Sequence, residues 1–561
     1  MSFQTNIEDS RIKKIITLSD IHSDIDSLII SLRDCAKVIK YKNRNARHNL
    51  YKFLRSDISL TEQVNINSRL TAYDDSLGFE WIGESSHVVI CGDILDGYRP
   101  PNNPSDPKNN IDDLDYPQVE IKILRFINAL NRLAQSQQYE PKGRIIKLLG
   151  NHEIMNMNIP YNVQINGQLF NRNTFQTNYI SEKAKLMNPY YTDFAVNPPK
   201  LYKREDIFKI GNYGFNLLFE GGCGLLVKIN NTICVHGRLT HKPYSYFDRC
   251  NQFIMSNRNP IEWGTHSELI DFLYDTSSFN TTREYPVRAN FTQLQKDNIV
   301  FSPLWDRINE DTEIDKRING RIDKHGFTKD TYCEDRKANL TVFLSDLKVQ
   351  FPAIYPSDVS ELVEKSRIVV GHCPQNYSSW FATSNTTFRT QIAEDEESNT
   401  FGQTIYTGKA NFDVNVSNDP LNPDQDKNIV FGISMECPKP NNIPDSYMYH
   451  VDVGASRAFD QDGAMIEVHD KKTEQQWFGS RTPQVLVVNR NPDMTETVTI
   501  VKSKIKNTRK FQRRNRYEEY IDVNKLNELS YDAPANTEYY EYALKYLKYK
   551  NKYLNLKNYF N

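Results

Sequence analysis

The sequence predicts an α/β fold in which short buried strands carry polar motifs at their ends. Five apolar runs rich in β-branched residues are each followed at once by a polar motif. Such runs are typical of short buried strands. Because α/β sheets place their chemistry just past the carboxyl ends of strands, we expect the motifs to meet. In chain order the runs and motifs are Ile15–Leu18 with Asp20-Ile21-His22, Val88–Cys91 with Gly92-Asp93-Ile94-Leu95-Asp96, Ile145–Leu149 with Gly150-Asn151-His152-Glu153, Thr232–Cys234 with Val235-His236-Gly237, and Ile368–Val370 with Gly371-His372.

The residue types in these motifs are those that hold a pair of divalent metal ions. Carboxylate oxygens and imidazole nitrogens, with one carboxylate shared, suit two ions about 3.5–4 Å apart. Asp20 and His22 are two residues apart on an extended strand end and can point to the same side, and Asp93 is the natural bridge. The predicted metal ligands are Asp20, His22, Asp93, Asn151, His236 and His372.

His152 is the predicted proton donor. It follows Asn151 directly, so we expect its side chain to face the other way, toward a leaving group. A histidine can donate a proton near neutral pH, and Asp96 can orient it by accepting from the other ring nitrogen. Each motif alone is weak, because most single histidines bind no metal. Five motifs in order, holding four of the 11 histidines, favour a metal site.

With these motifs the chain resembles the calcineurin-like metallophosphoesterases, whose fold is a sandwich of two β-sheets flanked by helices. The glutamate that ends the third motif, and the absence of a second histidine from the fifth, are similar to the phosphoprotein phosphatases. The resemblance covers residues 12–490, interrupted by long insertions, and diadenosine tetraphosphatases share much of the motif set. Segments that resemble the Shewanella-like protein phosphatases are Gly150–Asn156, Pro303–Arg307, Val370–Gln375, His450–Arg457 and Pro483–Leu486.

The resemblance implies a dinuclear-metal-dependent phosphomonoester hydrolase that acts on phosphoprotein. It places Asp20 and His22 on the first metal and makes Asp93 the bridge. The other three predicted ligands would hold the second metal, and the metals would be Mn²⁺, Fe or Zn²⁺. A metal-bridging hydroxide would be the nucleophile, with His152 paired to Asp96 as the general acid. Two rivals stay open, a dinucleoside polyphosphate hydrolase and a catalytically inert scaffold.

The chain departs from the family pattern where that pattern has phosphate-binding arginines. The second motif continues Gly97-Tyr98-Arg99 in place of Arg-Gly, and the fourth motif is followed by Arg238 where the family has a second glycine. A phosphate dianion still suits a bidentate guanidinium. The candidates for phosphate binding are therefore Arg238, Arg307 and Arg99, although for Arg99 a loop residue before Pro100-Pro101 is the favoured interpretation.

Composition and the lack of targeting segments predict a cytoplasmic protein. The net charge is −2 and the mean hydropathy is −0.64, and no apolar run of about 18 residues occurs, so neither nucleic acid nor membrane is an expected partner. The first 11 residues lack a signal-peptide core, which predicts a protein that is not secreted. The eight cysteines show no Cys-x-x-Cys and are predicted to be unpaired, with packing favoured over a redox role for Cys373.

Three parts are predicted along the chain. Residues 1–501 form the catalytic domain with its insertions, 502–536 a basic polar linker and 537–561 an amphipathic C-terminal helix. We interpret the basic stretch as solvated linker in preference to a site for phosphates or lipids. Tyrosines spaced by three and four give the helix a heptad-type seam, which can dock on the catalytic domain or on a partner. This tail resembles those of many giant-virus proteins of the mimivirus type, and for a viral protein the expected location is the host cytoplasm.

Overall fold

The computed structural model of the chain describes residues 3–43, 49–50, 53, 78–96, 119–165, 168–174, 190–193, 200–256, 262–263, 269, 272–273, 302–304, 329–372, 389–392, 403–407, 433–439, 445–453, 483–491, 493 and 495–503. All of them belong to one compact unit, which spans residues 1–104 and 116–508. The predicted linker, beyond residue 503, and the predicted helix 537–561 lie outside the described residues, as do Arg99, Arg307 and Cys373.

All five predicted strands are present, and each ends within one residue of the start of its motif. The apolar β-branched residues that predicted them are buried, with fully buried patterns in β5, β13 and β14. The pattern works because buried central strands must be apolar on both faces. The five strands are β2 (Lys14–Leu18), β5 (His87–Ile90), β6 (Arg144–Leu148), β13 (Thr232–Val235) and β14 (Arg367–Val370).

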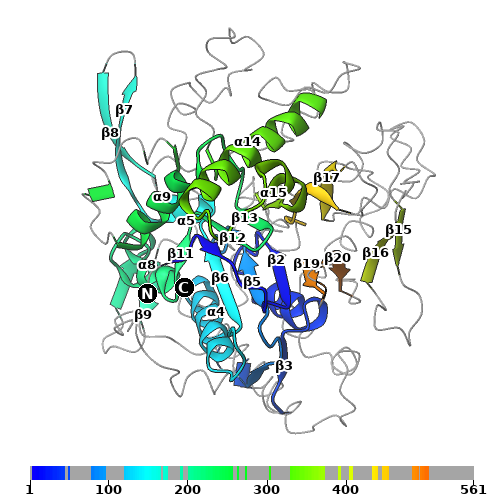
Figure 1. Cartoon of the computed structure of the whole chain (residues 1–561). Helices are drawn as coiled ribbons and strands as arrows, with labels where there is room; N and C mark the ends of the chain where they lie inside the picture. The colour runs from blue at the N-terminus through cyan, green and yellow to red at the C-terminus, as the bar shows by residue number, and fades with distance from the viewer. Residues whose placement is uncertain are drawn as a thin grey trace, which may run out of the picture. The chain divides into compact units, whose positions relative to one another are not determined.

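Two mixed sheets contain these strands (Figure 1). In the eight-stranded sheet β6, β5 and β2 run parallel and adjacent, and β19 pairs antiparallel to β2. In the six-stranded sheet β13, β14 and β18 run parallel. The eight-stranded order is β11 (Cys223–Gly224), β6, β5, β2, β19 (Gln484–Arg490), β20 (Glu496–Lys502), β16 (Gln403–Thr407) and β15 (Arg389–Ile392). The six-stranded order is β1 (Asn6–Ile7), β12 (Leu226–Ile229), β13, β14, β18 (Ser446–His450) and β17 (Ser434–Pro438).

The two sheets share one apolar core. A single cluster of buried side chains includes Val89 of β5 and Leu486 of β19 from one sheet, and Val227 of β12 and Val369 of β14 from the other. All four are fully buried. The inner faces of the sheets therefore pack on each other, and the architecture is a mixed α/β arrangement.

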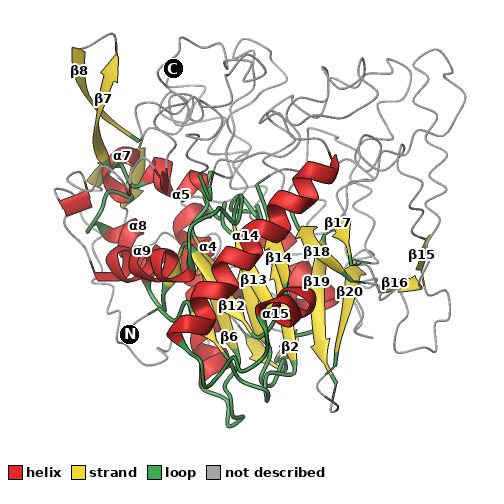
Figure 2. Cartoon of the chain, turned by 45° about the horizontal axis from the view of Figure 1, so that its top comes forward, coloured by secondary structure: helices red, strands yellow, loops and turns green. Residues whose placement is uncertain are grey.

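Helices cover the strands on either side. α4 (Val119–Gln135) packs on β6, and its Asn131 side chain accepts from the backbone N–H of Ile145 at 2.9 Å. α14 (Lys329–Gln350) and α15 (Val359–Lys365) lie against the six-stranded sheet (Figure 2). The other helices with bounds in the described part of the chain are α1 (Ile25–Ile30), the π-helical turn Ser31–Cys35, α5 (Asn151–Asn156), α7 (Arg204–Ile207), α8 (Tyr213–Phe219) and α9 (Tyr244–Ser256).

Three two-stranded ribbons complete the described elements, and two of them lie in the insertion between the third and fourth motifs. They are β3 (Ile39–Tyr41) with β4 (Phe79–Trp81), β7 (Pro160–Ile165) with β8 (Gln168–Asn173), and β9 (Tyr190–Asp193) with β10 (Lys200–Lys203). No helix in the described part of the chain is both long and apolar enough to cross a membrane.

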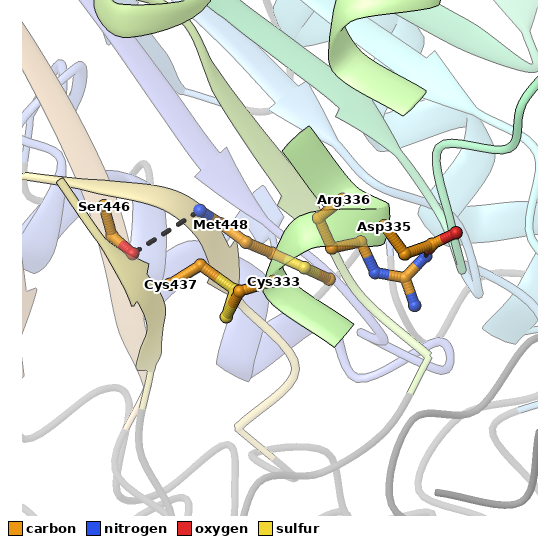
Figure 3. The surroundings of a disulfide bond; sticks show 6 residues. All are labelled: Cys333, Asp335, Arg336, Cys437, Ser446 and Met448. Carbon is orange, nitrogen blue, oxygen red and sulfur yellow. Dashed lines mark hydrogen bonds and ion pairs between the residues drawn. A yellow bond between two sulfur atoms is a disulfide. The ribbon is translucent and has the colours of Figure 1, made fainter. Parts of the chain in front are cut away.

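A disulfide joins Cys333 on α14 to Cys437 on β17, so the prediction of unpaired cysteines is wrong for this pair. Their Cα atoms lie 5.3 Å apart although 104 residues separate them in sequence. Figure 3 shows the bond beside Asp335 and Arg336, at the end of α14 that meets the edge strand. Spacing along the chain could not indicate this pairing, because only the packing of α14 on the sheet brings the two cysteines together. Five other cysteines in the described segments are buried thiols.

A buried ion network ties the two sheets together at the start of β14. Arg367 is 2% exposed. Its guanidinium donates to Glu496 on β20 at 2.6 Å and to Asp445, just before β18, at 3.1 Å. It also donates to the Thr232 hydroxyl on β13 at 3.1 Å. Arg367 therefore stabilises the packing of one sheet on the other, at the end of β14 opposite to His372.

We expect Arg367→Met to lower the free energy of unfolding by about 3–5 kcal/mol, because it removes the cation paired with Glu496 and one of the two cations, with Lys439, that pair with Asp445. Urea unfolding of the purified variant measures this. Lys365→Met is the matched control, since Lys365 pairs with Glu361 on the exposed face of α15 and should contribute less than about 1 kcal/mol. Equal effects of the two substitutions would contradict a structural role for the network.

Candidate metal centre

The predicted ligands meet because parallel strands end at the same sheet edge. β2 leads to Asp20 and His22, and the adjacent parallel strand β5 leads to Asp93. From the facing sheet, β13 leads to His236 and β14 to His372. Asn151 opens α5, directly after β6. All six side chains belong to residues that are no more than 6% exposed.

Asp93 lies at the centre, between two groups of imidazoles. Its Oδ2 is 3.9 Å from His22 Nε2 and 3.8 Å from His152 Nε2. Its Oδ1 is 3.4 Å from His236 Nε2. The side chains thus form two groups that could each hold a metal ion, His22–Asp93–His152 and Asp93–His236–His372. A carboxylate that turns one oxygen to each group has the geometry of a bridging ligand.

Backbone carbonyls orient two of the imidazoles so that their lone pairs face Asp93. His22 Nδ1 donates to the Leu95 carbonyl at 2.9 Å, and His236 Nδ1 donates to the Cys91 carbonyl at 2.7 Å. A donor at Nδ1 leaves Nε2 unprotonated in the neutral ring. Both Nε2 atoms are then available to a cation, which is how metal-ligating histidines are commonly held.

The Asn151 amide lies among the lone-pair atoms of three other predicted ligands. Its Oδ1 lies 3.0 Å from His236 Nε2, and the same position is 3.0 Å from both Asp93 Oδ1 and His372 Nδ1. Lone-pair atoms converge there, which is unfavourable unless a cation lies among them or the amide turns its NH₂ inward. Carboxylate, amide oxygen and imidazole together suit a borderline divalent metal.

The cluster also changes the protonation of its own members. Burial and the charge of Asp93 raise the pKa of Asp20 to about 6. Burial would lower the pKa of His236, but the charge of Asp93 and a hydrogen bond to it raise that pKa to about 9. Burial would raise the pKa of Asp93, and the charges of His236 and His152 instead hold it well below its usual range. Protons and metal therefore compete for the same lone pairs, so metal binding should release protons.

The turns that carry the ligands adopt a backbone conformation that L-residues rarely occupy. Asp20, His22, Asp93 and His372 have φ values of 53°, 37°, 52° and 71°. A non-glycine residue in this region costs on the order of 1–3 kcal/mol, and such residues cluster at functional sites. Close approach requires glycine nearby, because a Cβ on Gly150 would lie 2.2 Å from Asp93 Oδ1.

Glu153 holds the Asp93 turn in this shape, a role that the sequence did not reveal. Its carboxylate accepts from the backbone N–H groups of Asp93, Ile94 and Leu95 at 2.9, 2.8 and 3.0 Å. It also accepts from the N–H of Gly150 at 2.7 Å. Burial and the charge of Asp93 raise the pKa of Glu153 to about 7. An acceptor-only carboxylate suits a turn whose N–H groups all point inward.

His152 and Asp96 form a close pair beside the cluster. His152 Nδ1 lies 2.7 Å from Asp96 Oδ2, and the Asn156 side chain donates to the same oxygen at 3.0 Å. Burial would raise the pKa of Asp96, but the hydrogen bond from His152 and the charge of Arg204 hold it below its usual range. An ionised Asp96 keeps the proton on Nδ1, so Nε2 is the nitrogen that faces Asp93.

Arg204 was missed by sequence reasoning, as were Glu120 and Asn156. Arg204 is 3% exposed, and its guanidinium donates to Asp96 Oδ1 at 2.5 Å and to Glu120. It lies on α7, in the insertion between the third and fourth motifs, 108 residues after Asp96. No motif marks it, and an isolated arginine in an insertion carries no signal of burial.

Of the three arginines predicted to bind phosphate, the structure describes Arg238. It is fully buried two residues after His236, and its Nη2 pairs with Asp335 of α14 at 2.5 Å. Its backbone N–H donates to the Pro303 carbonyl at 3.1 Å, so the segment that leads to Arg307 begins beside the fourth motif. Arg307 and Arg99 themselves lie outside the described residues.

Comparison with known proteins gives only a weak likeness. No family profile matches the chain, and no curated protein sequence matches it. Solved structures of a cold-active protein tyrosine phosphatase are similar, among them one from a psychrophilic Shewanella species at 12% identity and a TM-score of 0.33, covering 89% of this chain and 83% of that chain. A variant of such an enzyme gives 11% identity and a TM-score of 0.34 at the same coverage. Such TM-scores do not establish a shared fold.

Proposed function

We propose that this chain is a dinuclear-metal-dependent phosphomonoester hydrolase with a calcineurin-like sandwich fold. The observation that carries the proposal is the position of Asp93, whose two oxygens face two separate imidazole groups. Asp20 completes the first group, since its Oδ1 is 4.0 Å from His22 Nε2. Two bound divalent ions would supply positive charge for the phosphate oxygens and lower the pKa of an attacking water.

The protein's own residues then provide orientation and a proton. Asp96 holds Nδ1 of His152, and Nε2 of the same ring lies 3.8 Å from Asp93 Oδ2. From this position His152 can donate its Nε2 proton to the oxygen of a leaving group bound among the ligands. Asn151 lies next to His152 in sequence but turns its amide toward His236 and His372. The division between a ligand residue and a donor residue on one short helix supports hydrolysis over simple metal storage.

A phosphorylated protein is the substrate class that we propose. Glu153, the single histidine of the fifth motif, and the segment around Pro303 all resemble the phosphoprotein phosphatases in sequence. The rival is a dinucleoside polyphosphate, because the second motif lacks the usual arginine and a substrate with more charge could suit a site with fewer cations. The inert scaffold is the second rival, and the complete set of ligands with a paired donor argues against it.

The test compares the two substrate classes on purified protein loaded with Mn²⁺. We expect phosphoserine, phosphothreonine or phosphotyrosine peptides to exceed diadenosine tetraphosphate in kcat/KM by at least about tenfold, or roughly 1.4 kcal/mol of transition-state preference. A tenfold preference for the dinucleotide would assign the chain to the nucleotidases. Two bound metals without turnover of either substrate would favour the scaffold.

Arg238 tests how the phosphate is bound. We expect Arg238→Lys to lower kcat/KM by an amount equivalent to about 1.5–3 kcal/mol of transition-state stabilisation. The reason is that a lysine cannot reproduce the bidentate contact of a guanidinium with a phosphate group. The inhibition constant of inorganic phosphate should rise in parallel, while metal content is unchanged. Arg249→Lys on the exposed side of α9 is the matched control. Unchanged phosphate inhibition would mean that Arg238 serves only the structural pair with Asp335.

A further inference from the structure

Asp96 uses both of its carboxylate oxygens, and they face different partners. Oδ2 accepts from His152 Nδ1 at 2.7 Å and from Asn156 at 3.0 Å. Oδ1 accepts from Arg204 Nη2 at 2.5 Å. The carboxylate is therefore held on the side away from the imidazole by a charged group. A carboxylate fixed at both oxygens cannot rotate without breaking at least one of these bonds.

Arg204 is in turn fixed by a second carboxylate. Its guanidinium donates to both oxygens of Glu120, at the start of α4, and it lies 3.3 Å from the Asn156 amide oxygen. Glu120 Oε1 also accepts from the backbone N–H of Asp96 at 3.0 Å. The exposed fractions of Arg204, Glu120 and Asp96 are only 1–3%. Buried charges of this kind are tolerated when they are paired and hydrogen-bonded on all sides.

We propose that Arg204 is a positioning residue, which through Asp96 fixes the imidazole of His152 for proton donation to the leaving group. This inference rests on the proposed hydrolase function. Arg204 touches none of the six predicted metal ligands in its hydrogen bonds with Asp96, Glu120 and Asn156. Its effect should therefore appear in the proton-transfer step, and not in metal binding.

Lysine is the informative substitution at this position. Arg204→Lys keeps the positive charge between Asp96 and Glu120, so the buried carboxylates stay neutralised. A lysine cannot donate to both carboxylates in the planar geometry of the guanidinium. If Arg204→Lys does not fold, the double variant Arg204→Gln with Glu120→Gln removes one charge of each sign and serves in its place.

The first measurement compares a poor and a good leaving group on the Mn²⁺-loaded enzyme. With phenyl phosphate we expect Arg204→Lys to lower kcat by about 10–100-fold, since small misplacements of a donor cost on this order. With 2,4-dinitrophenyl phosphate, which needs little protonation, the loss should be below about threefold. KM and the two bound metals should be unchanged. Equal losses on both substrates would overturn the proposal and leave Arg204 a purely structural residue.

A double-mutant cycle and a matched control sharpen the result. In a His152→Asn background, Arg204→Lys should have no further effect on phenyl phosphate, because the donor that it positions is gone. Additive losses would contradict the assignment. Arg132→Lys is the matched control. Arg132 of α4 is also a partly buried arginine in an ion pair, but its partner is Glu220 and not Asp96. It should lower kcat on neither substrate.

A spectroscopic readout separates this proposal from the function on which it rests. In protein labelled with ¹⁵N-histidine, the Nδ1–H of His152 should give a downfield proton signal that His152→Asn removes. Arg204→Lys should shift this signal or lose it to exchange with water, and an unchanged signal would overturn the proposal. If the wild-type enzyme hydrolyses neither phosphate ester, the proposed function fails, and the signal still decides the role of Arg204.

Discussion

Asp93→Asn should remove most of the bound metal and nearly all phosphatase activity. Among the described residues, Asp93 is the carboxylate shared by both imidazole groups, so the substitution affects two metal positions at once. A neutral amide offers one oxygen in place of two charged ones. Because two cations supply several kcal/mol of transition-state stabilisation, we expect kcat/KM to fall by at least about 10³-fold.

Elemental analysis of the purified variant, together with turnover of phenyl phosphate, checks this expectation. Asp248→Asn is the matched control, because Asp248 lies on α9 and its side chain accepts from Gln252. It should retain two metals and normal turnover. Two tightly bound ions in Asp93→Asn, with activity preserved, would exclude Asp93 as the bridge.

His152→Asn should leave both metals in place and slow the chemical step. The backbone N–H of His152 donates to Asp93 Oδ1 at 3.1 Å, and this contact does not depend on the side chain. Loss of a general acid should lower kcat by about 10²–10⁴-fold on phenyl phosphate. The loss should shrink when the leaving group is 2,4-dinitrophenolate.

The same variant distinguishes two roles that the geometry allows for this imidazole. His152 is also a member of the group His22–Asp93–His152, so it could serve as a ligand of the first metal. Loss of one metal from His152→Asn, with equal effects on both leaving groups, would assign it that role. His241→Asn, at an exposed position soon after the fourth motif, is the control and should behave as the wild type.

The strands and the gathering of the motif residues could be predicted because both depend on local pattern. Apolar β-branched runs such as Val88–Ile90 indicate buried strands. The residue just past such a strand lies at the edge of the sheet, beside the ends of the neighbouring parallel strands. The partners of those residues could not be predicted. Arg204, in an insertion, pairs with Asp96 although 108 residues separate them in sequence. Glu153 accepts hydrogen bonds from backbone N–H groups, and the sequence does not indicate which N–H groups will lie near it.

Arg238 is a second example of a residue whose contacts could not be predicted from its position in the sequence. Its place beside His236 suggested phosphate binding, but the burial of the residue and its pair with Asp335 depend on the packing of α14. The disulfide also depends on that packing, since Cys333 and Asp335 lie on the same end of the helix. Pairs of residues that are distant in sequence are brought together by the tertiary structure, and the sequence alone does not indicate them.

The Cys333–Cys437 bond also changes what the unfolded chain can do. It closes a covalent ring of chain with a sequence separation of 104 residues, and His372 lies inside that ring. A ring of about 100 residues lowers the entropy of the unfolded chain by an amount equivalent to about 4.7 kcal/mol. An oxidised chain that loses its tertiary structure therefore keeps the fifth motif inside a closed covalent loop. Reducing agents added to protect the buried thiols would cut this tether, so oxidised and reduced preparations are different starting states for refolding and for reloading with metal.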